Sequence, residues 1–123
     1  MNHLNDFLAQ WNAATIEALI DTAWGRPAVR GEARMVCWAE SSYKPLAFNA
    51  YVDSRGVRRK VRGLFQISDI HRGGLDAYPA GLDDQLMFDP VRNVIAAKEL
   101  YSRTGTWAAW SVAPDLGLVK EHG

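Results

Sequence analysis

The feature that most constrains this chain is an apolar stripe at helical spacing that ends in a carboxylate. Its apolar members are Val29, Ala33, Val36 and Cys37. Glu40 continues the same face one turn later. Pro27 suits the first turn of a helix, and Pro45 forbids its extension. We therefore expect a helix from about Pro27 to Ser41, with Glu40 on its inward face.

A carboxylate on the inward face of a helix cannot stay charged without a partner that neutralises it. Burial disfavours the ionised form and raises the pKa of the group, unless a partner neutralises it. One interpretation of Glu40 is a general acid that holds a proton near neutral pH. The other is a structural glutamate bonded to a neighbouring backbone group or an arginine. The residue by itself leaves both interpretations open.

Length and composition fit one globular domain. The chain has 123 residues, of which 48% are apolar, so we expect a single domain over residues 1–123. The formal net charge is zero, which argues against a polycation that coats nucleic acid. Cys37 is the one cysteine, so no internal disulfide is expected, and its place on the stripe predicts a buried thiol.

Several classes of site are not expected. No stretch approaches about 20 consecutive apolar residues, so we expect no membrane span. Residues 1–6 lack a basic region followed by an apolar run, so we expect no signal peptide. The three histidines (His3, His71 and His122) have no ligand-like spacing, and no glycine-rich phosphate loop is present. We therefore expect neither a metal nor another cofactor.

The rest of the chain predicts a mainly helical domain with a small β-hairpin or sheet. Residues 1–24 form an N-terminal helical segment whose apolar spacing slips midway, which indicates a kink or two short helices. Residues 49–52 and the stretch from Val57 are typical of a hairpin with glycine at the turn end. A last helix is capped by Asp89, begins with proline and ends at Gly105.

Three motifs occur in a fixed order along the chain. Residues 40–45 read Glu-Ser-Ser-Tyr-Lys-Pro, residues 63–67 read Gly-Leu-Phe-Gln-Ile, and residues 88–93 read Phe-Asp-Pro-Val-Arg-Asn. Over about residues 27–112 the chain resembles the lytic transglycosylase and goose-type lysozyme superfamily. The resemblance implies a lysozyme-like α+β fold with a substrate cleft. It also implies cleavage of the bond between N-acetylmuramic acid and N-acetylglucosamine in peptidoglycan.

The resemblance assigns roles to individual residues. Glu40 would be the acid that protonates the leaving oxygen, a task that suits a partly buried glutamate. Tyr43 would wall the pocket around Glu40, and Gln66 would hydrogen-bond the saccharide or hold the cleft loop. The two late tryptophans either stack on sugar faces or pack in the core. The residues predicted to contact substrate are Ser41, Tyr43, Gln66, Trp107 and Trp110.

One segment departs from the family pattern. Many transglycosylases carry Ala-Tyr-Asn near the end of the domain, and the tyrosine supports the catalytic glutamate. Residues 109–111 read Ala-Trp-Ser here. Tryptophan has no phenolic hydroxyl, so the support of Glu40 must differ. The Trp-Ser ending resembles some phage lysozyme domains.

The type of reaction depends on a second acid. A hydrolase needs a group that activates or places water, whereas a transglycosylase uses a hydroxyl of the sugar and manages with one glutamate. Asp53 falls where goose-type lysozymes carry a water-positioning aspartate, but it also suits the first position of a turn. Asp69 is the other candidate, and it equally suits the cap of a short helix. Hydrolysis and transglycosylation both remain open.

The leading hypothesis is a peptidoglycan-cleaving glycosidase that works as a monomer on glycan strands of the bacterial wall. If the chain is phage-derived, it is a free endolysin in the host cytoplasm or part of a virion. The alternative is a non-catalytic wall-binding or virion structural module with a lysozyme-like fold. Residues 55–62 are locally basic and form either a solvated hairpin arm or a surface for an anionic polymer. We expect no nucleic-acid partner.

Overall fold

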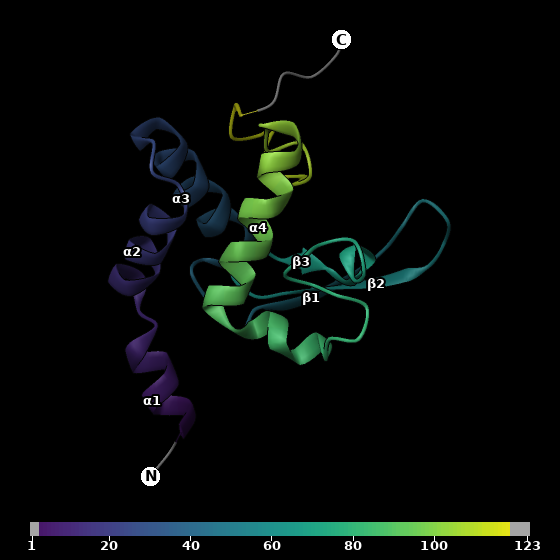
Figure 1. The fold of residues 1–123 in the computed structure, drawn as a ribbon, viewed down its shortest axis with the longest axis horizontal. Coiled ribbons are helices and arrows are strands. Elements are labelled where there is room, and N and C mark those ends of the chain that lie inside the picture. The colour runs from purple at the N-terminus through teal and green to yellow at the C-terminus, as the bar shows by residue number, and fades with distance from the viewer. Residues whose placement is uncertain (1–2, 119–123) are drawn as a thin grey trace.

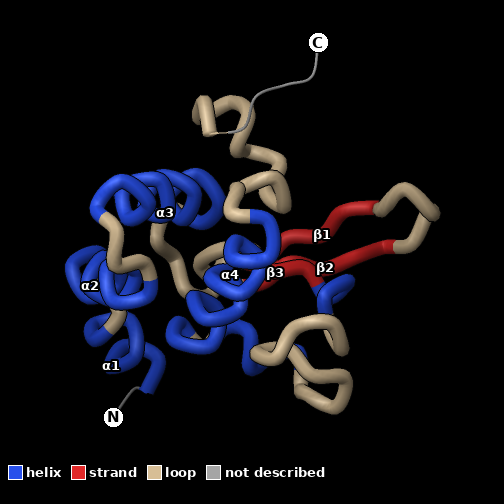
Figure 2. Tube along the Cα trace, turned by 45° about the horizontal axis from the view of Figure 1, so that its top comes forward, coloured by secondary structure: helices blue, strands red, loops and turns tan. Residues whose placement is uncertain are grey.

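The computed structural model describes residues 3–118, so His122 lies outside the described part of the chain. Within it α4 (Pro90–Thr104) stands between a helical pair and a small sheet (Figures 1 and 2). The other elements are α1 (His3–Gln10), α2 (Ala13–Ala23), α3 (Pro27–Ser41), β1 (Phe48–Val52), β2 (Arg58–Arg62), β3 (Ile67–Ser68), and the 3-10 helices η1 (Asp69–His71) and η2 (Asp84–Phe88).

The N-terminal segment forms two helices, α1 and α2, which was one of the two predicted arrangements. Asn12 separates them and caps α2, because its side-chain oxygen accepts a hydrogen bond from the Thr15 N–H at 3.1 Å. Helix α2 buries Ile16 and Ile20, whereas α1 buries none of its residues. None of the described helices is both long enough and apolar enough to span a membrane.

Helices α3 and α4 have the predicted boundaries. Helix α3 begins at Pro27 and buries Ala33, Val36 and Cys37, the apolar stripe of its sequence. Asp89 caps α4 by accepting the Arg92 N–H at 3.1 Å. The helix ends where Gly105 adopts a left-handed conformation.

An aromatic cluster joins the end of α2, the loop before β3, α4 and the C-terminal segment. Its members are Trp24, Phe65, Tyr101, Trp107 and Trp110. Lys98 of α4 lies at its edge. The ammonium donates to the Ala23 carbonyl at 2.8 Å and lies 5.6 Å from the centre of the Trp24 ring. This contact ties α4 to the end of α2, which explains a lysine within the apolar stripe of α4.

The sheet is antiparallel with the order β1-β2-β3. Strands β1 and β2 form the predicted hairpin, which projects away from the helices (Figure 1). In its register Asn49 lies opposite Val61 and Tyr51 lies opposite Arg59. Strand β3 is only two residues long, too short for its sequence to signal a strand. The result is the expected mainly helical domain with one small sheet.

Candidate active site

The Gly-Leu-Phe-Gln-Ile loop is held by Asn93, which is completely buried in α4. The Asn93 Oδ1 accepts the Phe65 N–H at 2.8 Å, and Nδ2 donates to the Arg62 and Met87 carbonyls, each at 2.8 Å. Gly63 has φ 82°, and a Cβ there would lie 2.3 Å from the Asn93 amide nitrogen, so only glycine fits. Sequence analysis included Asn93 in a motif but assigned it no role.

Gln66 lies on the cleft wall, but its amide is committed to the loop. Its backbone has φ 49°, and its Nε2 donates to the Ala47 and Gly63 carbonyls, both at 3.0 Å. Its Oε1 accepts a hydrogen bond from Asn49 Nδ2 at 2.8 Å. Both amide protons are therefore used within the protein, and these contacts fit the role of holding the cleft loop. One lone pair of Oε1 remains for a ligand.

A cleft of about 480 Å³ opens between the end of α3, the sheet and the C-terminal segment. The lining residues are Glu40, Asn49, Ala50, Tyr51, Val61, Gln66, Ile67, Ser68, His71, Leu100, Ala109, Trp110 and Ser111. The hydroxyls of Tyr51 and Ser68 share a hydrogen bond of 2.9 Å across β1 and β3. The cleft therefore offers hydroxyl, amide, imidazole and indole groups among its lining residues.

Glu40 lies in the wall of this cleft at the last turn of α3, half-buried. No residue in the described part of the chain forms a hydrogen bond or ion pair with its carboxyl group. Burial raises the pKa of Glu40 from the usual 4.5 to about 7, so the group exchanges a proton near neutral pH. One turn earlier, the buried thiol of Cys37 lies 3.6 Å from the Leu64 carbonyl, and burial raises its pKa to about 12.

His71 is a cleft residue that sequence analysis left among the scattered histidines. It ends η1, whose cap is Ser68, since Ser68 Oγ accepts the Ile70 N–H at 3.2 Å. Asp69 begins this short helix rather than capping it. Burial, and then the charge of Arg103, lower the pKa of His71, so its imidazole is neutral at neutral pH. No spacing in the sequence could have placed His71 in the same cleft as Glu40.

Asp53 belongs to the hairpin turn and does not line the cleft. Its carboxylate accepts the N–H groups of Arg55 and Val57, each at 2.9 Å, and pairs with Arg59 Nε at 2.9 Å. The Arg59 guanidinium, followed by the Val57 N–H, lowers the pKa of Asp53. These contacts fit the turn residue, which was one of the two interpretations of Asp53, and its place outside the cleft lining does not favour the role of a second catalytic carboxylate. Asp69 likewise does not line the cleft.

Two residues of the first motif also lie outside the cleft lining. The Ser41 hydroxyl donates to the Cys37 carbonyl at 3.1 Å, within α3. The Tyr43 hydroxyl donates to Glu17 Oε2 of α2 at 3.1 Å, so it points toward the N-terminal helices. Neither side chain therefore walls the Glu40 pocket, which corrects the predicted place of Tyr43. Both hydrogen bonds fit a role in stabilising the C-terminal end of α3.

The two late tryptophans differ in position. Trp107 is 1% exposed and donates its Nε1 to Glu32 at 3.0 Å, so it packs in the aromatic cluster and offers no face to a sugar. Trp110 lines the cleft, although it is only 5% exposed, and its Nε1 donates to the Phe65 carbonyl at 2.9 Å. The Trp-Ser departure therefore anchors the cleft loop rather than bonding to Glu40.

The family model described as "Transglycosylase SLT domain" matches residues 17–114, a span that contains all three motifs and the cleft. No curated protein and no solved structure matches the chain. The match agrees with the lysozyme-like α+β architecture of four helices and a small antiparallel sheet. It also implies peptidoglycan as the substrate and cleavage of the lytic transglycosylase type. The chain therefore belongs to the transglycosylase SLT domain family.

Proposed function

We propose that the protein is a lytic transglycosylase in which Glu40 is the acid and then the base. The bond cleaved joins N-acetylmuramic acid to N-acetylglucosamine in peptidoglycan. The observation that carries this proposal is the position of Glu40, which is half-buried in the cleft wall with its carboxyl unbonded to any described residue. A pKa of about 7 lets this group donate a proton and take one back near neutral pH.

The proposed reaction has two proton transfers through one carboxyl group. Protonated Glu40 donates to the glycosidic oxygen while the bond from that oxygen to C1 of the muramic acid breaks. The resulting carboxylate then accepts the proton of the C6 hydroxyl of the same sugar, and this oxygen forms a bond to C1. The product is a 1,6-anhydro end, Glu40 regains its proton, and no water is consumed.

The composition of the cleft favours transglycosylation over hydrolysis. Among the described residues that line it, Glu40 is the one carboxylate. Retaining and inverting glycosidases use a second carboxyl group, at about 5–5.5 Å or about 6.5–9.5 Å from the first. Asp53 is engaged in the hairpin turn, and Asp69 lies outside the lining. A mechanism that needs one acid therefore fits the chain better than one that needs two.

The polar residues that line the cleft together with Glu40 suit a sugar chain. Tyr51 and Ser68 present a hydrogen-bonded pair of hydroxyls, and His71 adds a neutral imidazole. Hydroxyl and imidazole groups act both as donors and as acceptors, which matches the hydroxyl and acetamido groups of the glycan. Trp110 contributes apolar surface to the same cleft.

The test is the product that the protein releases from purified sacculi, identified by mass spectrometry. We expect wild type to release fragments with anhydro-muramic ends, and Glu40→Gln to release none while its melting temperature does not fall below that of wild type. Glu32→Gln is the matched control, since Glu32 lies on α3 and accepts from Trp107 away from the cleft. Reducing ends would show hydrolysis instead. Binding to sacculi without release would show a non-catalytic module.

A further inference from the structure

The two residues that follow the end of α3 adopt a backbone conformation that side chains rarely accept. Ser42 has φ 52° and Tyr43 has φ 60°, so consecutive residues other than glycine are left-handed. Such residues persist where the surrounding structure holds them. The Ser42 N–H donates to the Trp38 carbonyl at 2.8 Å, which closes the helix but does not anchor the turn to another element. This turn begins two residues after Glu40.

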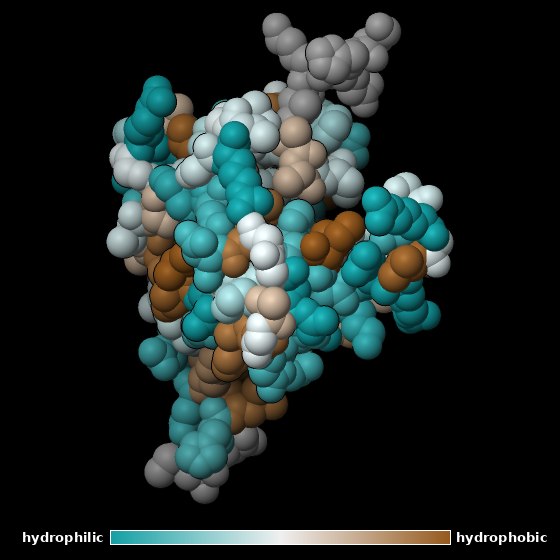
Figure 3. Space-filling model, turned by 45° about the vertical axis from the view of Figure 1, so that its right-hand side comes forward, coloured by the Kyte–Doolittle hydropathy of each residue, from teal (hydrophilic) through white to brown (hydrophobic). Residues whose placement is uncertain are grey.

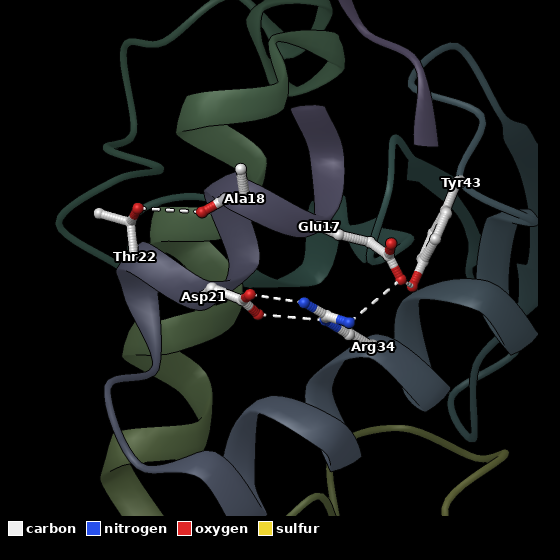
Figure 4. Close-up of polar contacts among 6 residues, drawn as sticks. All are labelled: Glu17, Ala18, Asp21, Thr22, Arg34 and Tyr43. Carbon is white, nitrogen blue, oxygen red and sulfur yellow. Dashed lines mark hydrogen bonds and ion pairs between the residues drawn. The ribbon is translucent and has the colours of Figure 1, made fainter. Parts of the chain in front are cut away.

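The anchor of the turn is the Tyr43 hydroxyl, which donates to Glu17 Oε2 at 3.1 Å (Figure 4). Glu17 lies on α2, 26 residues earlier in the chain. The ring of Tyr43 packs edge-on against Trp38, with ring centres 5.3 Å apart. Burial, followed by the hydrogen bond to Glu17, raises the pKa of Tyr43, so its phenol stays protonated and remains a donor.

Glu17 is itself held in place by Arg34 of α3. Arg34 Nη1 lies 3.4 Å from Glu17 Oε2, and its Nε donates to Asp21 Oδ1 at 3.1 Å (Figure 4). Arg34 Nη2 contacts the second carboxylate oxygen of Asp21, so the guanidinium is bound at both edges. We call Glu17, Asp21, Arg34 and Tyr43 the α2 latch. None of these four residues lines the cleft.

We propose that Glu17 is a positioning residue for the reaction, which it serves by holding Tyr43 and so fixing the left-handed turn that sets the depth of Glu40 in the cleft. This inference rests on the proposed role of Glu40 and deepens it. In the first motif, Tyr43 therefore contacts α2 rather than the substrate. The path from Glu17 to Glu40 runs through one hydrogen bond and a few residues of backbone.

Loosening the α2 latch has a consequence that can be measured. A loosened turn lets water reach the Glu40 carboxyl. Because burial raises the pKa of Glu40, this hydration lowers the pKa again. The acid then loses its proton at lower pH, so the alkaline limb of the pH–rate profile moves toward lower pH. The titratable groups near Glu40 are Tyr51 on β1 and His71 on η1, which line the same cleft, and Cys37, which lies one turn earlier on α3 and interacts with its charge. The pKa of the Cys37 thiol is about 12, and the pKa of the His71 imidazole is lowered, so neither group titrates on the alkaline side of neutral pH where the limb is measured.

The experiment measures fragment release from purified sacculi across neutral pH for Glu17→Ala, Tyr43→Phe and wild type. We expect both variants to move the alkaline limb down by roughly one pH unit and to lower kcat about tenfold. Glu17→Gln keeps an acceptor oxygen for Tyr43 and should restore both readouts. Thr22→Ala is the control on α2, since the Thr22 hydroxyl donates to the Ala18 carbonyl at 2.9 Å, away from the α2 latch (Figure 4). It should match wild type.

A wild-type alkaline limb in folded Tyr43→Phe would overturn the proposal, even if the melting temperature fell. Tyr43→Phe removes a single oxygen, so it decides the question if Glu17→Ala fails to fold. Failure of the proposed function gives a different result, because fragment release by Glu40→Gln would remove Glu40 itself from the reaction. An inactive Glu40→Gln together with an unmoved limb in Tyr43→Phe refutes the α2 latch alone.

Discussion

Asn93→Ala removes the side chain that ties the cleft loop to α4. Asn93 is 0% exposed and makes three hydrogen bonds of 2.8 Å to peptide groups. The partners are the Phe65 N–H and the carbonyls of Arg62 and Met87, and alanine offers none of them a replacement. Because the site is buried, water cannot readily take over these bonds.

The magnitude follows from the number of peptide groups left without a partner. Each buried polar group that loses its partner costs about 1–3 kcal/mol, so three such groups cost about 3–9 kcal/mol if little water enters. The free energy of unfolding of a native domain is about 5–15 kcal/mol, so this loss is a large part of the total. For a domain of this size it corresponds to a fall in melting temperature of roughly 10 °C or more.

The assay is urea unfolding followed by tryptophan fluorescence, with far-ultraviolet circular dichroism as a second probe of cooperativity. Asn49→Ala is the matched control, since it removes one partly buried bond, from Asn49 Nδ2 to Gln66 Oε1. We expect that control to lose about 0.5–1.5 kcal/mol. A loss below about 1 kcal/mol in Asn93→Ala would refute the reasoning, because it would mean that the loop does not depend on these bonds.

Four further predictions concern other residues of the protein. Asp53→Asn should leave fragment release near wild type, because Asp53 lies outside the cleft lining; a strong loss would restore its role as a second carboxylate. Gly63→Ala should lower the free energy of unfolding by more than about 1 kcal/mol in a thermal melt, owing to its positive φ and the clash with Asn93. Gly31→Ala in α3, where a Cβ meets nothing within 4 Å, should instead stabilise the protein by about 0.5–1 kcal/mol. Glu40→Gln should gain stability relative to wild type as pH rises from 4.5 to about 7, since a raised pKa makes deprotonation destabilising; equal stability across that range would mean that Glu40 is not buried.

The helices that carry the motifs could be predicted because their limits are set locally. Proline at the first position begins α3 and α4, Pro45 prevents α3 from continuing, and Gly105 ends α4 in a left-handed conformation, so these signals lie within the helices or close to them. The inward direction of Glu40 follows from the helical period alone. The slip in apolar spacing before α2 was visible for the same reason, because Asn12 caps the second helix from inside the segment.

The rest of the site depends on contacts between residues far apart in the chain. Tyr43 points to Glu17 because α2 packs beside α3, and no spacing within the motif encodes that. Trp107 and Trp110 are three residues apart, and only their packing against Phe65 and α3 decides which one reaches the cleft. Asp53 suited two roles by position, and the turn bonds that decide between them form only in the folded hairpin.

Trp110, which stands where many transglycosylases carry a tyrosine, bears on how one acid would serve the two proposed steps. A hydroxyl bonded to a carboxylate stabilises the charged form and lowers its pKa, which favours the base over the acid. The Trp110 N–H is instead committed to the Phe65 carbonyl, and burial is the cause that raises the pKa of Glu40. A group with a pKa near the working pH is protonated often enough to donate and ionised often enough to accept. In the proposed mechanism the protein would therefore set the pKa of its acid through the burial of Glu40 in the cleft wall. Contacts outside the cleft, such as those of Asn93 and Glu17, would then contribute to catalysis by holding the segments that bury it.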